Sequence, residues 1–312
     1  MSTAVNWAAR KQSPIFGPID MICRKMGYLK NRPIMPGVLK HAGITCIFFF
    51  CVHFISAQGT SPDMVFVHGG KFKMGSLFGG SDEQPVHQVV LDDFYMGRFE
   101  VTQRQWRLIM DRDTNKFYFG RCDSCPAERI SWNDVQEYIR NLNEKTGMNF
   151  RLPTEAEWEF AARGGLLSKG YKYSGSNTDT AVAWKVGNSD SRTHPVGGKK
   201  PNELGIYDMT GNVFEWCADW YAPAWYGVSP SGNPVGPPEG VFRIIRGGSW
   251  FHDYSGLASS DRESANPSFR YGYVGFRLCR SAANSKPPAV KPEKPDSADA
   301  KRKAFYKKFI GF

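Results

Sequence analysis

The stretch LGIYDMTGNVFEWCADW, residues 204–220, decides how the rest of the chain folds. It is too aromatic to be a solvated loop, because four large rings must bury most of their area: Tyr207, Phe214, Trp216 and Trp220. Its middle holds Gly211 and Asn212, residue types that tolerate left-handed backbone. We therefore expect a tight turn inside a buried segment.

Two carboxylates, Asp208 and Glu215, stand on either side of this turn. Buried side by side, they would repel each other unless a cation or a basic side chain lay between them. With the carbonyl oxygens of Gly211 and Val213 they form an all-oxygen set that suits Ca²⁺, although the spacing is not that of an EF-hand. In the alternative, Asp208 caps the turn and Glu215 pairs with an arginine. Candidates for that arginine are Arg246 and Arg277.

The net charge of +10 comes from the two ends of the chain. Residues 1–57 hold seven Lys or Arg and one Asp, and residues 281–312 hold eight Lys or Arg and three acids. The segment between them has 25 basic and 26 acidic residues, which makes it nearly neutral and long enough to bury a sizeable core. A nucleic-acid-binding face has no support there.

The front of the chain predicts an export signal. Residues 42–55 (AGITCIFFFCVHFI) are an apolar run too short to span a bilayer comfortably, preceded by basic residues and followed by Ser-Ala-Gln. We expect residues 1–57 to be a signal peptide cleaved after Ala57. The first 34 residues look foreign to such a signal, which makes Met35 a candidate start. The mature protein is then periplasmic or at the cell surface, an oxidising location.

Four cysteines follow the signal. Cys122 and Cys125 leave three interpretations open: a local disulfide, thiols that are free or paired elsewhere, and a redox pair or half of a zinc site. The strand-then-helix context of a redox motif is missing, and no second CxxC completes a zinc site. Cys217 and Cys279 are either a structural pair or buried thiols.

Local patterns predict short strands and capped helices. A hairpin is expected over 64–75, further strands over 86–91, 94–96, 241–245 and 273–278, and a long loop over 166–201. Capping signatures predict three helix starts, near Gln103, at Ser131 and at Thr154. The second helix runs to about Lys145 with its apolar positions on one face: Val135, Tyr138, Ile139 and Leu142.

Seven motifs resemble, in order, those of the formylglycine-generating, or sulfatase-modifying-factor, family. They are 66–76 (FVHGGKFKMGS), 99–106 (FEVTQRQW), 130–138 (ISWNDVQEY), 151–158 (RLPTEAEW), 202–216 (NELGIYDMTGNVFEW), 246–250 (RGGSW) and 274–278 (VGFRL). The resemblance covers roughly residues 63–280. It implies an α+β domain, a variant of the C-type-lectin-like fold with little regular secondary structure. Residues 281–312 are expected to be a disordered basic Pro/Lys tail, whose end could form a basic amphipathic helix.

The resemblance also implies a metal at the turn. In that family the matching loop holds calcium through the positions of Asp208, Gly211, Val213 and Glu215, which we take as the metal site of this chain. A second family calcium site would fall near Asn188–Asp190, where this chain is shorter.

The catalytic centre is where the sequence departs from the family. The family's enzymes oxidise a sulfatase cysteine to formylglycine with oxygen and copper(I), held between two thiolates just after the RGGS turn. The matching positions here are His252 and Leu257, and no cysteine occurs between Cys217 and Cys279. Copper is therefore not expected, and we assign no catalytic residue.

The resulting hypothesis is a secreted pseudoenzyme, a non-catalytic binding or assembly protein. It is similar to gliding-motility and secretion-associated domains of the Bacteroidetes. Its partner would be a protein of an envelope or secretion assembly, or a surface glycan, and membrane contact would come only from the signal or the C-terminal tail. The expected groove surrounds Trp250, His252 and Asp253, with Arg262 and Arg270 nearby. The alternative is a metal-dependent oxidoreductase whose site is rebuilt around His252.

Overall fold

Three helices begin where capping residues stand in the sequence. Helix α1 (Gln103–Met110) follows Thr102, whose hydroxyl accepts from the Gln105 backbone N–H while the Gln105 side chain accepts from the Thr102 N–H. Ser131 caps α2 (Trp132–Thr146) in the same way, and Gly147 ends it in left-handed backbone at φ 67°. Thr154 caps α3 (Glu155–Ala162). All three predicted helices are confirmed.

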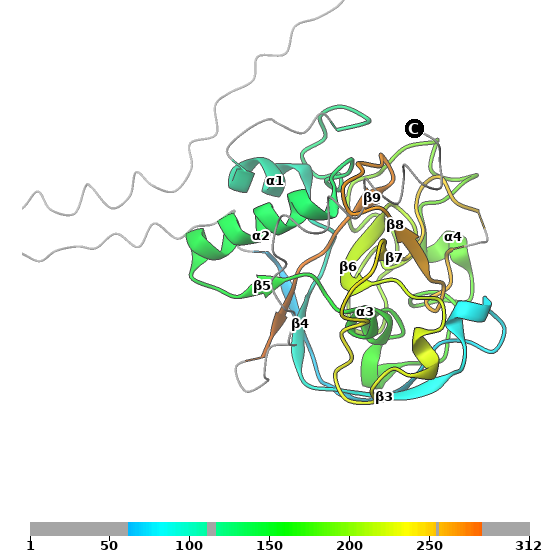
Figure 1. The fold of residues 1–312 in the computed structure, drawn as a ribbon. Helices are drawn as coiled ribbons and strands as arrows, with labels where there is room; N and C mark the ends of the chain where they lie inside the picture. Colours follow the sequence, from blue (N-terminus) through cyan, green and yellow to red (C-terminus); the bar gives the residue numbers. More distant parts are fainter. Residues whose placement is uncertain (1–61, 111–116, 254–255, 283–312) are drawn as a thin grey trace, which may run out of the picture. The chain divides into compact units, whose positions relative to one another are not determined.

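The computed structural model describes residues 62–110, 117–253 and 256–282, whose strands form three sheets (Figure 1). One sheet has the order β1-β4-β10-β5, a second pairs β2 with β3, and the third has the order β8-β7-β6-β9. The strands are β1 (Met64–Val67), β2 (Gly70–Met74), β3 (His87–Leu91), β4 (Phe94–Gly97), β5 (Phe150–Arg151), β6 (Phe214–Trp220), β7 (Arg243–Arg246), β8 (Glu263–Ala265), β9 (Val274–Gly275) and β10 (Cys279–Ser281). This confirms the predicted α+β class.

The hairpin predicted over 64–75 is wrong. Strand β1 pairs with β4, and β2 pairs with β3 in a different sheet. The reason lies at Gly69, where an added Cβ would stand 2.2 Å from the carbonyl oxygen of Leu91. This close backbone approach carries the chain out of the first sheet instead of folding it back. The predicted strand over 273–278 is also too long, because only 274–275 pair with a neighbour there and the next strand, β10, begins at Cys279.

Long irregular segments connect these elements. Between α3 and β6 the chain forms only the short helices η2 (Gly165–Leu167) and α4 (Asp179–Val182), as the predicted long loop requires. Two further single turns are η1 (Ser81–Glu83) and η3 (Trp225–Gly227). The predicted signal peptide and nearly all of the predicted basic tail lie outside the described residues. Within the described residues, no helix is both long enough and apolar enough to cross a membrane.

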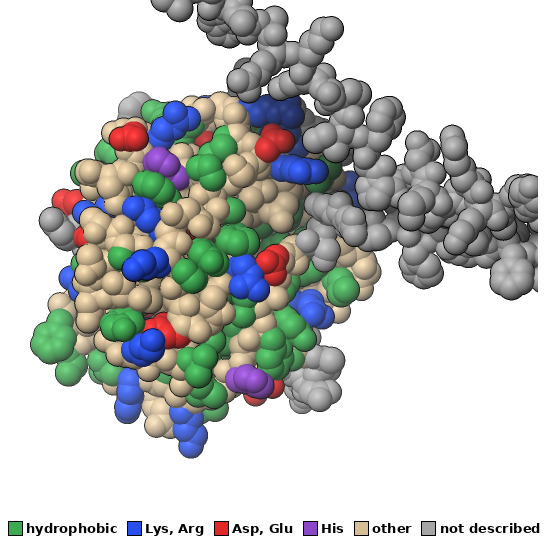
Figure 2. Space-filling view, turned by 180° about the vertical axis from the view of Figure 1, so that it is seen from behind, with side chains coloured by type: hydrophobic (Ala, Val, Ile, Leu, Met, Phe, Trp, Pro, Cys, Tyr) green, Lys and Arg blue, Asp and Glu red, His purple; other side chains and the backbone are tan. Residues whose placement is uncertain are grey.

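Strand β6 holds two hydrophobic clusters together. Phe214 and Trp216 belong to the cluster built on α1 and α2, whereas Cys217 belongs to the cluster of α3 and strands β1 to β4. Trp216 is completely buried and Trp220 nearly so, as predicted, but Tyr207 is only half-buried. On the face drawn in Figure 2, Lys and Arg side chains lie scattered among apolar and acidic ones, which fits a nearly neutral folded segment.

Candidate functional site

The turn in front of β6 has the predicted left-handed backbone. Asp208, Gly211 and Asn212 have φ of 57°, 81° and 61°. A Cβ added at Gly211 would stand 2.4 Å from the carbonyl oxygen of Trp184, so only glycine fits there. The turn therefore brings the four predicted ligand residues together on one short segment.

Glu215 is paired with an arginine, as one prediction had it. Its Oε2 accepts from Arg277 Nε at 2.6 Å and from Trp158 Nε1 at 2.7 Å, and its Oε1 accepts from Arg277 Nη2 at 2.6 Å. Arg277 also donates to the carbonyl oxygens of Gly97 and Tyr207, and it is completely buried. The other candidate, Arg246, pairs with Glu159 instead.

A third buried carboxylate, Glu100, joins this site, and the sequence reasoning missed it. Its Oε2 accepts from Asn212 Nδ2 at 2.7 Å and its Oε1 from the Val213 N–H at 3.2 Å. Burial first, and then the charges of Asp208 and Glu215, raise the pKa of Glu100 well above its ordinary value. The sequence signal for it is its place in the motif FEVTQRQW, two residues before the capping residue Thr102.

Asp208 fits a cation better than Glu215 does. Its Oδ2 accepts from the Gly197 N–H at 2.6 Å, while its buried Oδ1 has no hydrogen-bond partner in the described part of the chain. Burial raises the pKa of Asp208 to about 6. Glu215 already accepts three hydrogen bonds, which leaves about one of its roughly four lone-pair directions. With all three carboxylates ionised and one guanidinium, the site carries an excess of negative charge that protons or a cation would offset.

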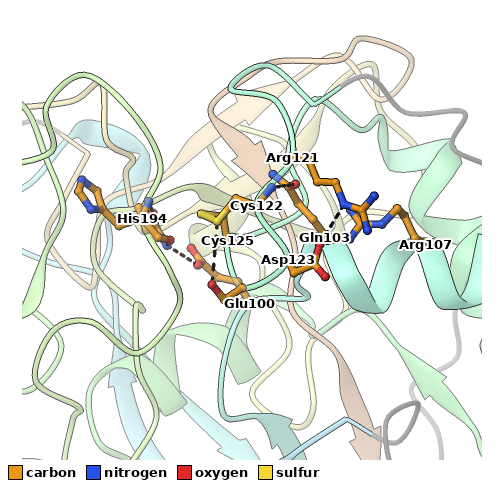
Figure 3. The surroundings of a disulfide bond; sticks show 10 residues. Glu100, Gln103, Arg107, Arg121, Cys122, Asp123, Cys125 and His194 are labelled. Atoms are coloured by element: carbon orange, nitrogen blue, oxygen red, sulfur yellow. Dashed lines mark hydrogen bonds and ion pairs between the residues drawn. A yellow bond between two sulfur atoms is a disulfide. The ribbon is translucent and has the colours of Figure 1, made fainter. Parts of the chain in front are cut away.

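The Cys122–Cys125 pair is a disulfide, which settles one open interpretation (Figure 3). The loop that it closes is tied to α1: the Cys125 carbonyl accepts from the Gln103 N–H, and Gln103 Oε1 accepts from the Cys122 N–H. In the same view Asp123 lies toward Arg107 and Arg121, its ion-pair partners. Cys217 and Cys279 are free and buried, and burial raises the pKa of both thiols, which favours the thiol over the reactive thiolate.

A cavity of about 440 Å³ lies at Trp250 and Arg270, but His252 and Asp253, which the predicted groove was to surround, are not part of its lining. We call it the aromatic cavity; its lining is Tyr118, Arg129, Trp250, Phe251, Arg270, Tyr271, Gly272 and Tyr273. Phe251 stacks on Tyr273 with ring centroids 6.4 Å apart and exposes 61% of its surface. Arg270 at its rim holds Asp134 through two hydrogen bonds of 2.7 and 2.8 Å. The run FRYGY at 269–273 was a sequence signal for this wall that went unused.

His252 lies beside the aromatic cavity, and Leu257 does not reach it. The His252 ring packs edge-on against Phe214 at 4.7 Å, and its Nδ1 is 2.8 Å from the Ser249 hydroxyl. Burial lowers the pKa of His252 below its ordinary value. Leu257 is completely buried in a small cluster with Tyr173 and Val182.

The prediction that Arg262 borders this groove is wrong. Arg262 is buried, and its Nε and Nη2 donate to the two carboxylate oxygens of Glu155 at 2.7 and 2.9 Å. It lines a separate and larger cavity. A buried guanidinium needs a carboxylate partner, and Glu155 at the start of α3 provides one that sequence proximity to Trp250 did not reveal.

The comparison with known proteins agrees with the sequence resemblance. The profile described as "Sulfatase-modifying factor enzyme 1-like domain" matches residues 53–282. The chain is 35% identical over 240 residues to chaperone protein LppX of Paenibacillus barcinonensis, with 61% of this chain and 79% of that protein covered. It is 36% identical over 173 residues to the formylglycine-generating enzyme of Streptomyces coelicolor, with 50% and 53% covered.

Another relative is much longer than the matched segment. The chain is 34% identical over 245 residues to serine/threonine-protein kinase pkn1 of Chlamydia caviae; the match covers 72% of this chain but spans only 39% of that kinase. Among solved structures, Treponema denticola variable protein 1 aligns with a TM-score of 0.65 and 31% identity over 70% of this chain and 95% of that one. PvdO from Pseudomonas aeruginosa aligns at 0.60 and 30%, over 72% and 95%.

Proposed function

The chain belongs to the sulfatase-modifying factor enzyme 1-like domain family, and from that premise we propose that it is a non-catalytic binding or assembly protein. The proposal concerns the domain of residues 62–282, because relatives such as pkn1 extend far beyond the matched part. The names of its relatives include a chaperone and a variable protein as well as formylglycine-generating enzymes. Membership of the family therefore does not by itself assign oxidation chemistry.

One observation carries the proposal: the surroundings of His252 and Leu257. These are the positions where the resemblance expects the two copper-binding thiolates. Leu257 is sealed in an apolar cluster and offers no ligand atom. His252 has one ring nitrogen at the Ser249 hydroxyl and its ring face among aromatic side chains. His252 and Leu257 therefore cannot form a copper(I) site in which two soft ligands bind the same ion.

The aromatic cavity supplies the binding surface in this proposal. Phe251 and Tyr118 expose 61% and 62% of their surface, and Phe251 packs against Trp250 and Tyr273, so the exposed rings belong to one aromatic cluster. Aromatic rings flanked by arginine are the side chains that dominate binding energy at protein interfaces. We therefore assign the cavity to a segment of a partner protein in an envelope or secretion assembly; a surface glycan is the competing ligand.

The absence of formylglycine formation is tested directly. Purified protein is incubated with a Cys-x-Pro-x-Arg sulfatase peptide, copper(I) and oxygen, and the peptide is analysed by mass spectrometry. We expect no aldehyde, while a formylglycine-generating enzyme assayed in parallel converts the peptide. Conversion by this protein would overturn the proposal.

Partner binding is tested with Phe251→Ala and Tyr118→Ala in pull-downs from envelope extract. Both changes remove exposed rings from the aromatic cavity and should lower the yield of a specific partner at least tenfold. Leu166→Ala, which alters a side chain that is 60% exposed elsewhere, is the matched control. If both cavity variants retain every partner, the cavity is not the binding surface. Inhibition of the pull-down by oligosaccharides would indicate that the aromatic cavity binds a glycan instead of a protein segment.

The alternative function is a metal-dependent oxidoreductase rebuilt around His252, with Asp253 beside it. The observation in its favour is that burial lowers the pKa of His252, so the imidazole is in the neutral form that binds metals. Stoichiometric copper or iron in the purified protein, lost in His252→Ala, would support this alternative. Metal-free protein with an intact fold would count against it.

We further propose that the turn at Asp208 binds calcium. The unpartnered Asp208 Oδ1 and the crowding of Glu100 and Glu215 around Arg277 support a cation there. Ca²⁺ at 100 times its Kd would add about 2.7 kcal/mol to the free energy of unfolding. The measurement is calcium binding by calorimetry together with the melting temperature in Ca²⁺ and in EGTA. Equal heats of binding in the wild type and in Asp208→Ala would refute this site.

Export of the protein also remains a proposal, supported by the apolar run at 42–55. N-terminal sequencing of the protein recovered from cells should give a chain that begins at Gln58. A mature protein that retains residues 42–55 would contradict cleavage after Ala57.

A further inference from the structure

A second cavity of about 760 Å³ lies away from the aromatic cavity. Its wall contains four acidic residues: Asp82, Glu83, Asp261 and Glu263. The arginines that line it, Arg163 and Arg262, are held by Glu159 and Glu155, which lie outside the lining. Their charges are therefore largely neutralised, and Lys172 is the remaining basic residue among those that line the cavity; Arg246, behind the wall, also acts on Glu83 and Asp261. We call this space the acidic cavity.

None of the four carboxylates forms an ion pair with a residue of the described part of the chain. Asp82 accepts from the Tyr221 hydroxyl at 3.0 Å, and Asp261 accepts from the Ala258 N–H at 2.8 Å. Burial, followed by the charges of Asp82 and Asp261, raises the pKa of Glu263. The group is thus crowded with like charges that a cationic ligand would relieve.

Glu83 provides an independent sign of a ligand. Its side chain is only 3% exposed and lines the cavity, yet no donor of the described residues stands in hydrogen-bond geometry to its Oε2. Its Oε1 accepts from the Gly80 N–H at 2.7 Å. Burial raises the pKa of Glu83 and outweighs the opposing effect of the nearby Ser260 side chain, which lowers it. A buried carboxylate oxygen without a donor costs free energy that a bound N–H group would recover.

The rim adds an apolar contact to these charges. Phe78 lines the acidic cavity with its ring fully exposed, and its neighbour Leu77 is 69% exposed. Both stand on the glycine-containing loop between β2 and η1. A ligand that carries cationic groups beside large apolar side chains would satisfy both features.

We propose that the acidic cavity binds the basic aromatic segment at the end of the same chain, residues 301–312 (KRKAFYKKFIGF). This segment has five Lys or Arg and no Asp or Glu. It also has five large apolar side chains: Phe305, Tyr306, Phe309, Ile310 and Phe312. The charges of cavity and segment are complementary, and the rings of the segment match Phe78. The inference does not depend on the function proposed for the aromatic cavity.

The length of the intervening chain permits this contact. Residues 283–300 separate the last described residue from the segment. Eighteen residues span at most about 60 Å when extended. A domain of roughly 220 residues has a radius of gyration of about 17 Å, so the linker can reach most of its surface.

Zero-length carbodiimide coupling tests the contact in the full chain. It joins a lysine amine to a carboxylate only where the two touch, and mass spectrometry identifies the pairs. We expect the lysines of 301–308 to be joined mainly to Asp82, Asp261 and Glu263. In a mixture of isotope-labelled and unlabelled protein, both joined peptides should carry the same label. Mixed labels would show a second copy as the occupant and overturn the proposal.

Trypsin cleavage provides a readout that does not rely on coupling. Bound residues 301–308 should be cleaved slowly, and Asp82→Asn combined with Glu263→Gln should raise that rate at least fivefold. Glu144→Gln, an exposed acid on α2, is the matched control and should change nothing. An unchanged rate in the double variant, or coupling spread evenly over surface acids such as Glu144, would overturn the assignment.

Discussion

Arg277 is the residue on which the buried acids in front of β6 depend. Its guanidinium holds Glu215 with two hydrogen bonds of 2.6 Å. Burial raises the pKa of Glu100 and of Asp208, and the charge of Arg277 opposes this rise in both. Arg277→Met would leave Glu215 charged in a completely buried place. Breaking such a buried pair costs about 3–5 kcal/mol. Urea denaturation of the purified protein measures this loss.

The matched control for this prediction is Arg98→Met. Arg98 pairs with Asp63 at 2.8 Å, but both side chains are partly exposed, at 35% and 57%. Exposed pairs contribute about 0–1 kcal/mol. If the two variants lose similar free energy of unfolding, the buried acids do not depend on Arg277.

Asp219 should make the protein less stable as the pH rises. Burial, and then the nearby Glu155 carboxylate, raises the pKa of Asp219 to about 8. In the unfolded chain its pKa is about 3.9, so between pH 4 and pH 8 the folded state alone retains the proton. The free energy of unfolding therefore falls with pH through this window, by up to about 1.4 kcal/mol per pH unit for this group.

Asp219→Asn removes this dependence while keeping an oxygen that can accept from the Glu155 N–H, as Asp219 Oδ2 does at 2.9 Å. Denaturation curves between pH 5 and 8 in calcium-free buffer should have a shallower slope in the variant. The variant should still lose some stability as the pH rises, because burial also raises the pKa of Glu128, to about 7. Identical slopes in the two proteins would show that Asp219 is ionised in the folded state.

At the scale of elements, the helices were predictable because their signals are local. Ser131, Asp134 and Gly147 fix the ends of α2, and the apolar spacing fixes its buried face. Strand pairing was not predictable in the same way. The partner of β1 is β4 rather than the adjacent β2, and that choice follows from the backbone contact at Gly69 with a residue 22 positions later.

The buried face of α2 gives a prediction for the element as a whole. Leu142 is completely buried in the cluster with Trp106 and Tyr138, whose rings stack at 5.3 Å. Leu142→Ala should cost about 2–5 kcal/mol, because the cavity that it leaves cannot fully collapse. The loss is read from urea denaturation. Glu144→Gln on the exposed side of the same helix should stay within about 0.5 kcal/mol of the wild type.

The disulfide loop should stabilise the start of α1. The bond closes four residues, for which the chain-entropy relation gives about 2 kcal/mol. The Cys122→Ser, Cys125→Ser double variant should lose about that much free energy of unfolding. Amide hydrogen exchange at Gln103 and Arg104 should accelerate, since their N–H groups donate to the carbonyls of this loop. Exchange rates equal to those of the wild type would show that the disulfide loop does not stabilise the start of α1.

At the scale of the whole molecule, the ordered motifs predicted the fold, but only part of the candidate site. Glu215 and Asp208 were found because they flank one turn within eight residues. Glu100 lies 108 positions before Asp208, and the aromatic cavity joins Tyr118 to Tyr273. Such contacts exist only once the sheets have formed. Arg262 was misplaced for the same reason, since its partner Glu155 is 107 residues away.

The central position of β6 predicts that residues 62–282 unfold in one cooperative step. Trp216 is buried in the cluster of α1 and α2, and the next residue, Cys217, is buried in the cluster of α3. Neither cluster can lose its packing without exposing this strand, so tryptophan fluorescence and far-ultraviolet circular dichroism should report coincident denaturation midpoints. Trp216→Ala should lower both midpoints together, at a cost of about 3–5 kcal/mol. Separate midpoints for the two signals, in the wild type or in this variant, would mean that the clusters are independent and that β6 only connects them.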